Sequence, residues 1–174
     1  GAPIRRETEY FSIYSLISRR TILDSDEALI FCYCDLDHLK YVNDTYGHAE
    51  GDRYLCTFVD MVTNSVRKKD IFARIGGDEF VALLTGISAK EGGVECAKRL
   101  CEAVGSMEDP NLGGLRLSCS IGGAICPKDG TDYDTLFVKA DTAAYEAKRL
   151  GKNRYVFYTP GLELKNGYCT SSMS

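Results

Sequence analysis

The sequence predicts an α+β domain in which helices flank a mainly antiparallel central sheet of about five strands. The chain has 174 residues, enough for one domain at about 150 residues per domain. Short apolar runs of strand length alternate with longer stretches of helical periodicity, in the order β-α-α-β-β-α-β-α-β. A Gly-Gly turn between two apolar runs near the middle predicts a hairpin, which makes neighbouring strands antiparallel.

The first half of the expected domain contains a strand, two helices and the hairpin. Residues 28–35 are apolar and bounded by polar residues, as in a buried strand. Asp37 could cap the first helical turn, and Gly47 separates it from a longer amphipathic helix. The expected elements are a strand at 28–35, helices at 37–43 and 47–69, and hairpin strands at 71–75 and 80–84.

The second half is expected to add two helices and two strands. Thr131 or Asp132 would cap the last helix, which Gly151 closes. The expected elements are a helix at 88–104, a loop at 105–114, a strand region at 115–126, a tight turn at 127–130, a helix from 131 or 132 to 151 and a strand at 155–158. The domain is thus expected over residues 28–158, after a lead-in helix or linker remnant at 1–27 and before a loose tail at 159–174.

Charge and composition exclude several classes of protein. Lys and Arg number 21 and Asp and Glu 25, so the net charge is −4, which argues against a nucleic-acid polymer as partner. The apolar run from Ala28 to Cys34 is far shorter than the roughly 20 residues that cross a bilayer, and no signal-peptide pattern opens the chain. We therefore expect a soluble, cytoplasmic domain without direct membrane insertion, although its parent protein could be membrane-anchored.

The eight cysteines are expected to be small buried hydrophobes in a reducing compartment. No C-x-x-C pair occurs, and the chain has two histidines, so no zinc-finger spacing is present.

Two pairs of acidic residues are candidates for chemistry. Asp35 and Asp37 follow the first strand, where alternation puts them on one side. A carboxylate beside a core needs compensation, for which a metal ion serves; otherwise the two residues cap a helix. Asp78 and Glu79 at the hairpin tip either hold a metal or accept a proton, or they lie in an exposed acidic turn. If the strand end and the hairpin tip are neighbours, they supply ligands for Mg²⁺-assisted phosphoryl transfer.

Three ordered blocks of the sequence resemble one known family. Residues 74–80 read RIGGDEF, the signature of the GGDEF family, the diguanylate cyclases. Residues 35–44 and the glycine-containing pairs at 47–48 and 51–52 are similar to a second block of that family. Residues 140–153 resemble its last helix and the loop that follows. The matches span roughly residues 28–158.

The resemblance implies a fold like the palm of nucleotide cyclases and polymerases, in agreement with the order of elements. It also implies a reaction in which two GTP become cyclic di-GMP and two pyrophosphates. Each domain would hold one GTP, and the 3′-hydroxyl of each GTP would attack the α-phosphate of the other across a homodimer. Mg²⁺ or Mn²⁺ is the expected cofactor, and a sensor region is the expected partner that brings two domains together.

The family's catalytic residues carry over to matching positions in this sequence. Asp35 and Asp78 are expected to bind the metal ion, with help from the Leu36 carbonyl. Asp78 or Glu79 would deprotonate the 3′-hydroxyl, and Asp78 is favoured. Lys40 would neutralise charge that develops on the phosphates.

The resemblance also implies how guanine is recognised. Asn43 and Asp52 would read the guanine edge, because an amide and a carboxylate can pair with its O6, N1–H and N2–H₂ groups. His48 would lie beside the nucleotide.

For the phosphates, the resemblance implies glycines and lysines. Gly76 and Gly77 remove side-chain bulk, so a ligand can approach the backbone. Lys148 and Lys152 would hold the terminal phosphates as point charges, with Lys152 in place of the family's usual arginine. Without the family, these two lysines would be interpreted as a solvated helix face.

A second site is implied by the R-x-x-D pattern of Arg67 and Asp70, which in this family binds cyclic di-GMP and inhibits the enzyme. Arginine suits this task because its fork can grip phosphate and guanine acceptors. Basic residues at that position could instead satisfy the dipole of the preceding helix.

One block departs from the family. The usual D-x-L-T-G-L-x-N-R-R pattern corresponds to residues 11–20, where only Leu16, Arg19 and Arg20 match. An alternative function therefore stays open, in which a weak or inactive GGDEF-like module binds GTP or cyclic di-GMP for signalling. A single-substrate nucleotide cyclase or a polymerase-type palm fits the carboxylates but not the guanine-reading pair.

Overall fold

The computed structural model describes residues 12–19, 28–66, 69–87 and 90–163. After a helix over residues 12–19, the elements in chain order are β1 (Ala28–Leu36), α2 (Leu39–Tyr46), α3 (His48–Ser65), β2 (Ile71–Arg74), β3 (Glu79–Ile87), α4 (Lys90–Gly105), β4 (Glu108–Asp109), a 3-10 turn (Pro110–Leu112), β5 (Leu115–Arg116), β6 (Cys119–Cys126), α5 (Tyr133–Arg149) and β7 (Arg154–Phe157).

The central sheet has the order β2-β3-β1-β6-β7. Every pair in it is antiparallel except β6 and β7, which run parallel. The structure therefore confirms an α+β domain with a mainly antiparallel five-stranded sheet. In the middle strand β1, Asp35 lies opposite Glu79 of β3 on one side and Ser120 of β6 on the other.

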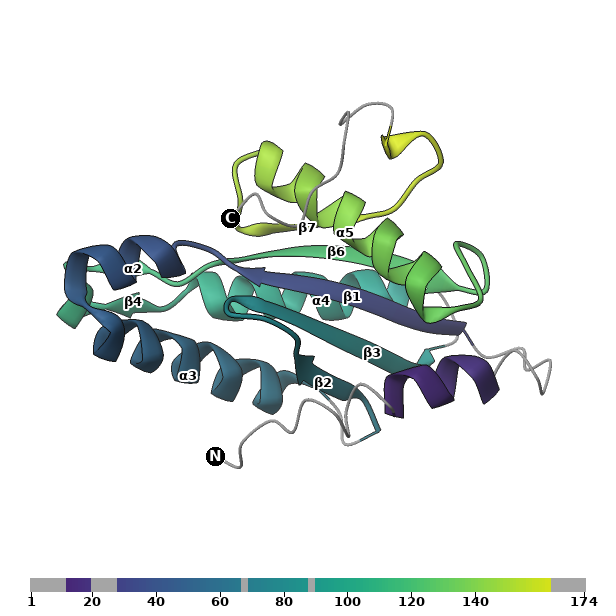
Figure 1. Cartoon of the computed structure of the whole chain (residues 1–174), viewed down its shortest axis with the longest axis horizontal. Helices are drawn as coiled ribbons and strands as arrows, with labels where there is room; N and C mark the ends of the chain where they lie inside the picture. The colour runs from purple at the N-terminus through teal and green to yellow at the C-terminus, as the bar shows by residue number, and fades with distance from the viewer. Residues whose placement is uncertain (1–11, 20–27, 67–68, 88–89, 164–174) are drawn as a thin grey trace.

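Helices cover both faces of the sheet (Figure 1). Even-numbered residues of β1, such as Cys32 and Cys34, pack with α3 and α4, whereas odd-numbered residues, such as Phe31 and Tyr33, pack with α5 and the helix at 12–19. The alternation of side chains along a strand explains the two sets. Because both faces of β1 are covered, its sequence is apolar almost throughout.

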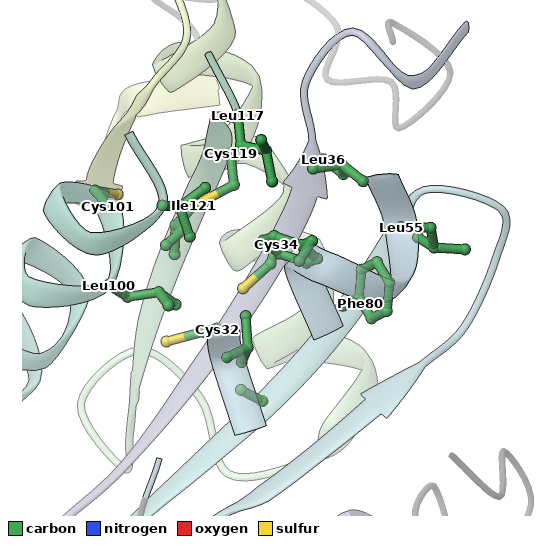
Figure 2. Packing of buried hydrophobic residues seen from close by; sticks show 14 of the residues in the cluster. Cys32, Cys34, Leu36, Leu55, Phe80, Leu100, Cys101, Leu117, Cys119 and Ile121 are labelled. Atoms are coloured by element: carbon green, nitrogen blue, oxygen red, sulfur yellow. The ribbon is translucent and has the colours of Figure 1, made fainter. Parts of the chain in front are cut away.

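Cys32, Cys34, Cys101 and Cys119 are buried in the core under α4 (Figure 2). Burial raises the pKa of the Cys32 and Cys34 thiols well above the usual range. A hydrogen bond with Cys101, reinforced by burial, does the same for Cys119. The expectation of small buried hydrophobes is confirmed for these four residues, although Cys56 is exposed.

The predicted last helix begins as expected, because Asp132 caps α5 by accepting from the Thr135 N–H at 2.9 Å. Asp37, by contrast, does not cap α2. Its place is taken by His38, which adopts a left-handed conformation with φ 68° and makes no side-chain capping bond.

Two further segments differ from the expectations. The loop predicted at 105–114 contributes to the small β4–β5 ribbon, and Arg53 of α3 pairs with Asp109 of this ribbon at 2.6 Å. The tail was expected to be loose from residue 159, yet Leu162 is buried against Ala143 and Tyr158. Residues 164–174 lie outside the described part of the chain.

We predict that Gly122→Ala strongly destabilises the domain. A Cβ at Gly122 would lie 1.8 Å from the Ala140 carbonyl oxygen and 2.3 Å from the Ala144 nitrogen, so the backbone of α5 would have to move off β6. Overpacking of this kind should cost about 3 kcal/mol of unfolding free energy.

Urea unfolding followed by circular dichroism measures this cost. Gly77→Ala is the control, because a Cβ there meets no atom within 4 Å. Equal unfolding midpoints for Gly122→Ala and the wild-type chain would contradict the close packing of α5 on β6.

Candidate active site

A pocket of about 140 Å³ lies where the end of β1, the start of α2, the hairpin tip and the end of α5 meet. Its lining combines carboxylates with ammonium groups, and the residues are Asp35, Leu36, Asp37, His38, Leu39, Lys40, Tyr41, Asp78, Lys148 and Lys152. The strand end and the hairpin tip are joined directly, because the Leu36 N–H donates to the Asp78 carbonyl at 2.9 Å. The two acidic pairs of the sequence are therefore neighbours in space.

The Asp35 carboxylate is buried, and its two oxygens differ in their partners. Its Oδ2 pairs with the Lys148 ammonium from α5, whereas its Oδ1 is buried without a hydrogen-bond partner. Burial raises the pKa of Asp35 to about 7; Lys148 opposes this rise, and the charges of Asp78 and Asp37 add to it. A bare anionic oxygen in this position is costly unless a cation approaches it.

Asp37 differs from Asp35, because both oxygens of its carboxylate accept hydrogen bonds from the protein. Oδ2 accepts from Ser118 Oγ at 2.6 Å and from the Asn153 N–H at 3.1 Å, and Oδ1 accepts from Ser120 Oγ at 2.8 Å. Its backbone oxygen accepts from the Tyr54 hydroxyl at 2.8 Å. Asp37 thus ties the end of β1 to β6 and to the loop after α5.

Arg74 shapes the tip of the hairpin. Its guanidinium donates to the Gly76 carbonyl at 2.9 Å and to the Gly77 carbonyl at 2.7 Å, which holds both glycines in a tight turn. The Ile75 N–H donates to the Glu79 carbonyl at 3.0 Å and closes the turn. This turn brings Asp78 to the pocket.

Glu79 takes a different direction from Asp78 and does not line the pocket. Its Oε1 accepts a hydrogen bond of 2.5 Å from the hydroxyl of Tyr33. Burial, with this hydrogen bond, raises the pKa of Tyr33 well above its usual range. The two acids of the signature therefore have different surroundings.

The residues expected to read guanine lie on α2 and α3 rather than in the pocket lining. Asn43 is in α2, and its side chain packs so closely on Gly51 of α3 that a Cβ there would lie 1.7 Å from Asn43 Oδ1. Asp52 follows Gly51, and His48 begins α3; both are exposed. Because Gly51 has no side chain, the Asn43 amide can lie directly against α3.

Three lysines approach the pocket from different elements. Lys40 is exposed on α2, and Lys148 is in the last turn of α5. Lys152 lies in the loop after α5 with φ 65°, and Asn153 follows with φ 48°. The bond from Asn153 N–H to Asp37 holds this left-handed loop at the pocket.

The predicted product site is described in part. The Asp70 carboxylate accepts from the Thr85 N–H at 3.0 Å, and the Thr85 hydroxyl donates to the Lys69 carbonyl at 3.1 Å. Arg67 lies outside the described residues, so its relation to Asp70 stays a prediction.

The residues of the pocket fit a divalent cation. The partnerless Asp35 oxygen, the Asp78 carboxylate and the Leu36 carbonyl are hard oxygen donors of the kind Mg²⁺ prefers. In the described part of the chain, no group of three or more His, Cys, Asp or Glu side chains could hold a metal ion. Mg²⁺ is commonly held by one or two carboxylates together with substrate phosphates, which agrees with such a sparse set.

A model of the family "Diguanylate cyclase, GGDEF domain" matches residues 14–154. The chain belongs to the GGDEF domain family. It is 39% identical over 142 residues to the biofilm architecture maintenance protein MbaA of Vibrio cholerae, covering 75% of this chain and 18% of MbaA. It is 37% identical over 131 residues to the probable diguanylate cyclase DgcT of Escherichia coli, covering 71% of this chain and 29% of DgcT. The chain thus spans less than a third of either relative.

The fold agrees with this membership. The GGDEF domain of PA1120 (TpbB or YfiN) from Pseudomonas aeruginosa superimposes with a TM-score of 0.84 at 23% identity, covering 93% of this chain and 94% of that one. Within residues 12–19, 28–66, 69–87 and 90–163 of the present GGDEF domain, no helix has the length and apolar character to span a membrane.

Several residues that build the site carry no motif of their own. Tyr33 resembles any apolar strand residue, and Ser118 and Ser120 are small polar residues far from Asp37 in the sequence. The i, i+2 spacing of the two serines in a predicted strand was the available signal, because it puts both hydroxyls on one face.

We predict that Asp35 makes the stability of the metal-free GGDEF domain fall as pH rises. Its folded pKa of about 7 exceeds the value of about 3.9 of an unfolded Asp, so the folded state binds the proton more tightly. This contribution is complete below about pH 4 and is lost as pH rises through about 7.

The test compares thermal unfolding of the wild-type chain and Asp35→Asn at pH 5 and pH 8 in the presence of a chelator. The melting temperature should fall more for the wild-type chain than for the variant. An equal fall in melting temperature for both proteins would contradict the assignment of this pH dependence to Asp35.

Proposed function

We propose that this GGDEF domain is a diguanylate cyclase, which condenses two GTP into cyclic di-GMP and releases two pyrophosphates. The observation that carries the proposal is the partnerless, buried Asp35 oxygen, which shares one pocket with Asp78 and three lysines. Anionic oxygens beside ammonium groups suit a nucleoside triphosphate bound with a divalent cation. The name of the relative DgcT, a probable diguanylate cyclase, supports the same reaction.

In the proposed reaction, the 3′-oxygen of one GTP attacks the α-phosphorus of the other, and the bond to pyrophosphate breaks. Asp78 is the favoured acceptor of the 3′-hydroxyl proton, because it lines the pocket whereas Glu79 does not. Lys40, Lys148 and Lys152 would balance the charge of the phosphates and of the leaving pyrophosphate.

We infer that Asp35, Asp78 and the Leu36 carbonyl would hold Mg²⁺ or Mn²⁺. Such an ion would neutralise phosphate charge and polarise the reacting phosphoryl group. Lys148 reaches Asp35 from α5, so its ammonium balances this carboxylate and can also contact the triphosphate.

Selection of GTP would rest on α2 and α3. Asn43 and Asp52 would bind the guanine edge, and His48 would lie beside the base. Gly76 and Gly77 would leave room for the phosphates at the hairpin tip. Since one domain supplies ligands for one triphosphate, the second GTP would come from a second copy, and the active form would be a homodimer.

The proposal includes regulation. Cyclic di-GMP would bind back at Arg67 and Asp70 and inhibit the enzyme, and a sensor region would control how two domains meet. Localisation in the cytoplasm, where GTP is available, fits this role.

One alternative has an observation in its favour. A nucleotide-binding module without turnover would agree with the altered block at residues 11–20. Within that block, however, Ile13 and Ile17 fill the core beside β1, and no residue of 12–19 lines the pocket. The altered residues at 12–19 therefore lie on a helix that packs against the core and not in the pocket, which favours the active enzyme.

We predict that Asp78→Ala abolishes synthesis of cyclic di-GMP, because it removes both a metal ligand and the favoured proton acceptor. The purified domain, freed of carried-over nucleotide, is incubated at high concentration with GTP and Mg²⁺, and the products are separated by chromatography. Asp134→Ala, at the opposite end of α5, is the control for loss of an acidic side chain.

Product from the wild-type chain and Asp134→Ala, but not from Asp78→Ala, is the expected result. An unchanged rate in Asp78→Ala would refute the catalytic assignment. GTP binding without product, even in a forced dimer, would favour the binding module.

We also predict that Gly51→Ala weakens selection of guanine. The new Cβ would displace the Asn43 amide, and loss of one net hydrogen bond should reduce GTP affinity about tenfold while ATP affinity changes little.

Calorimetric titration with GTP and with ATP measures the ratio of the two affinities. Cys56→Ala, at an exposed position of α3, is the control. A wild-type ratio of GTP to ATP affinity in Gly51→Ala would argue against guanine recognition by Asn43.

A further inference from the structure

The loop after α5 has two successive residues other than glycine in the left-handed region. Lys152 has φ 65° and Asn153 has φ 48°. Asparagine tolerates this conformation, but for a lysine it is sterically unfavourable and persists only where the surroundings determine it. Lys152 also lines the pocket. The unfavourable conformation therefore occurs at a residue that the pocket contains.

Hydrogen bonds from three parts of the domain hold the backbone around Lys152. Its N–H donates to the Ala147 carbonyl of α5 at 3.0 Å, and its carbonyl accepts from Arg154 Nε of β7 at 3.0 Å. The next N–H along the chain, that of Asn153, donates to Asp37 Oδ2 at 3.1 Å. The peptide group that joins Lys152 to Asn153 is therefore held through both its oxygen and its nitrogen.

Asp37 is well fixed as the acceptor for this loop. It is 3% exposed, and its carboxylate also accepts from Ser118 Oγ at 2.6 Å and from Ser120 Oγ at 2.8 Å. Hydrogen bonds to an ionised carboxylate are stronger than those between neutral groups. The Asn153 side chain lies against the end of α4, where a Cβ at Gly105 would be 3.1 Å from Asn153 Oδ1. Contacts with the end of β1 and the end of α4 thus hold the loop in place.

We propose that Asp37 is a positioning residue for the triphosphate: by holding the Asn153 N–H, it keeps Lys152 in the left-handed conformation that brings its side chain to the pocket. This role rests on the proposed cyclase function, in which Lys152 contacts the terminal phosphates. A flexible lysine loses conformational freedom when it binds a phosphate, and a backbone that is already in place lowers this cost. Asp37 thereby strengthens the preference of the site for GTP over GMP, which lacks the terminal phosphates.

The affinities for GMP and for a non-hydrolysable GTP analogue, measured by calorimetric titration with Mg²⁺ present, test this role. Asp37→Ala should lower the affinity for the analogue about tenfold and leave that for GMP unchanged, because it weakens only the contact with the terminal phosphates. Asp37→Asn should keep most of the preference, since its amide oxygen can still accept from the Asn153 N–H. A wild-type ratio of the two affinities in Asp37→Ala would overturn the proposal.

A double-mutant comparison shows whether Asp37 acts through Lys152. Lys152→Ala should itself lower the affinity for the analogue, and the addition of Asp37→Ala should lower it no further. Losses that add in the double variant would mean that Asp37 acts on another group, which would overturn the proposal.

The matched control is Asp129→Ala. It removes another buried carboxylate that accepts a backbone N–H, that of Ile125 at 2.7 Å, and Asp129 does not line the pocket. The ratio of the two affinities should stay at its wild-type value. A loss as large as that in Asp37→Ala would show a general effect of destabilisation and would also overturn the proposal.

A pair of variants at Asn153 gives the same test if Asp37→Ala does not fold. Asn153→Gly keeps the N–H and adopts a positive φ without strain, so it should keep the wild-type preference for the analogue. Asn153→Pro has no N–H and a φ fixed at about −65°, so it should lose this preference about tenfold. Equal ratios in the glycine and proline variants would contradict the role of Asp37.

These titrations do not depend on turnover. If the wild-type chain binds the analogue but makes no cyclic di-GMP from GTP, the proposed function fails and the affinity ratios still decide the role of Asp37. If the wild-type chain binds the analogue no more tightly than GMP, Lys152 does not hold the terminal phosphates, and the proposed role of Asp37 is wrong.

Discussion

The structure depends on two buried carboxylates at the end of β1, the middle strand of the sheet. Strands pair with β1 on both sides and helices cover both its faces, so Asp35 and Asp37 at its end are buried. A buried carboxylate is costly without partners. Asp37 meets this cost with two serine hydroxyls and a backbone N–H, whereas Asp35 has one lysine and keeps one oxygen without a partner.

Because their partners differ, Asp37 has a structural role, whereas Asp35 is left for the proposed chemistry. Asp37 fixes β6 and the loop after α5, which brings Lys152 to the pocket. Arg74 holds the Gly-Gly turn, which brings Asp78 to the same pocket. Groups that are satisfied within the protein thus hold in place the groups left to act on a ligand.

Local patterns were enough to predict the sheet, the hairpin and the capping of α5 by Asp132, because each depends on residues close in sequence. The nearness of Asp35 and Asp78 followed from the family pattern. The contacts of Asp37 and Tyr33 could not be predicted, since their partners lie far along the chain and meet them only once the sheet forms. The serines that bind Asp37, for example, are 81 and 83 residues away.

The central claim is that Asp35 and Asp78 form one cation site for a nucleoside triphosphate. Crystals of the domain grown with Mn²⁺ and a non-hydrolysable GTP analogue would test it by anomalous scattering. We expect a manganese peak in contact with Asp35 Oδ1, Asp78 and the Leu36 carbonyl, with the triphosphate beside Lys148 and Lys152. A bound analogue with manganese elsewhere, and with Asp35 in contact with Lys148 alone, would contradict it.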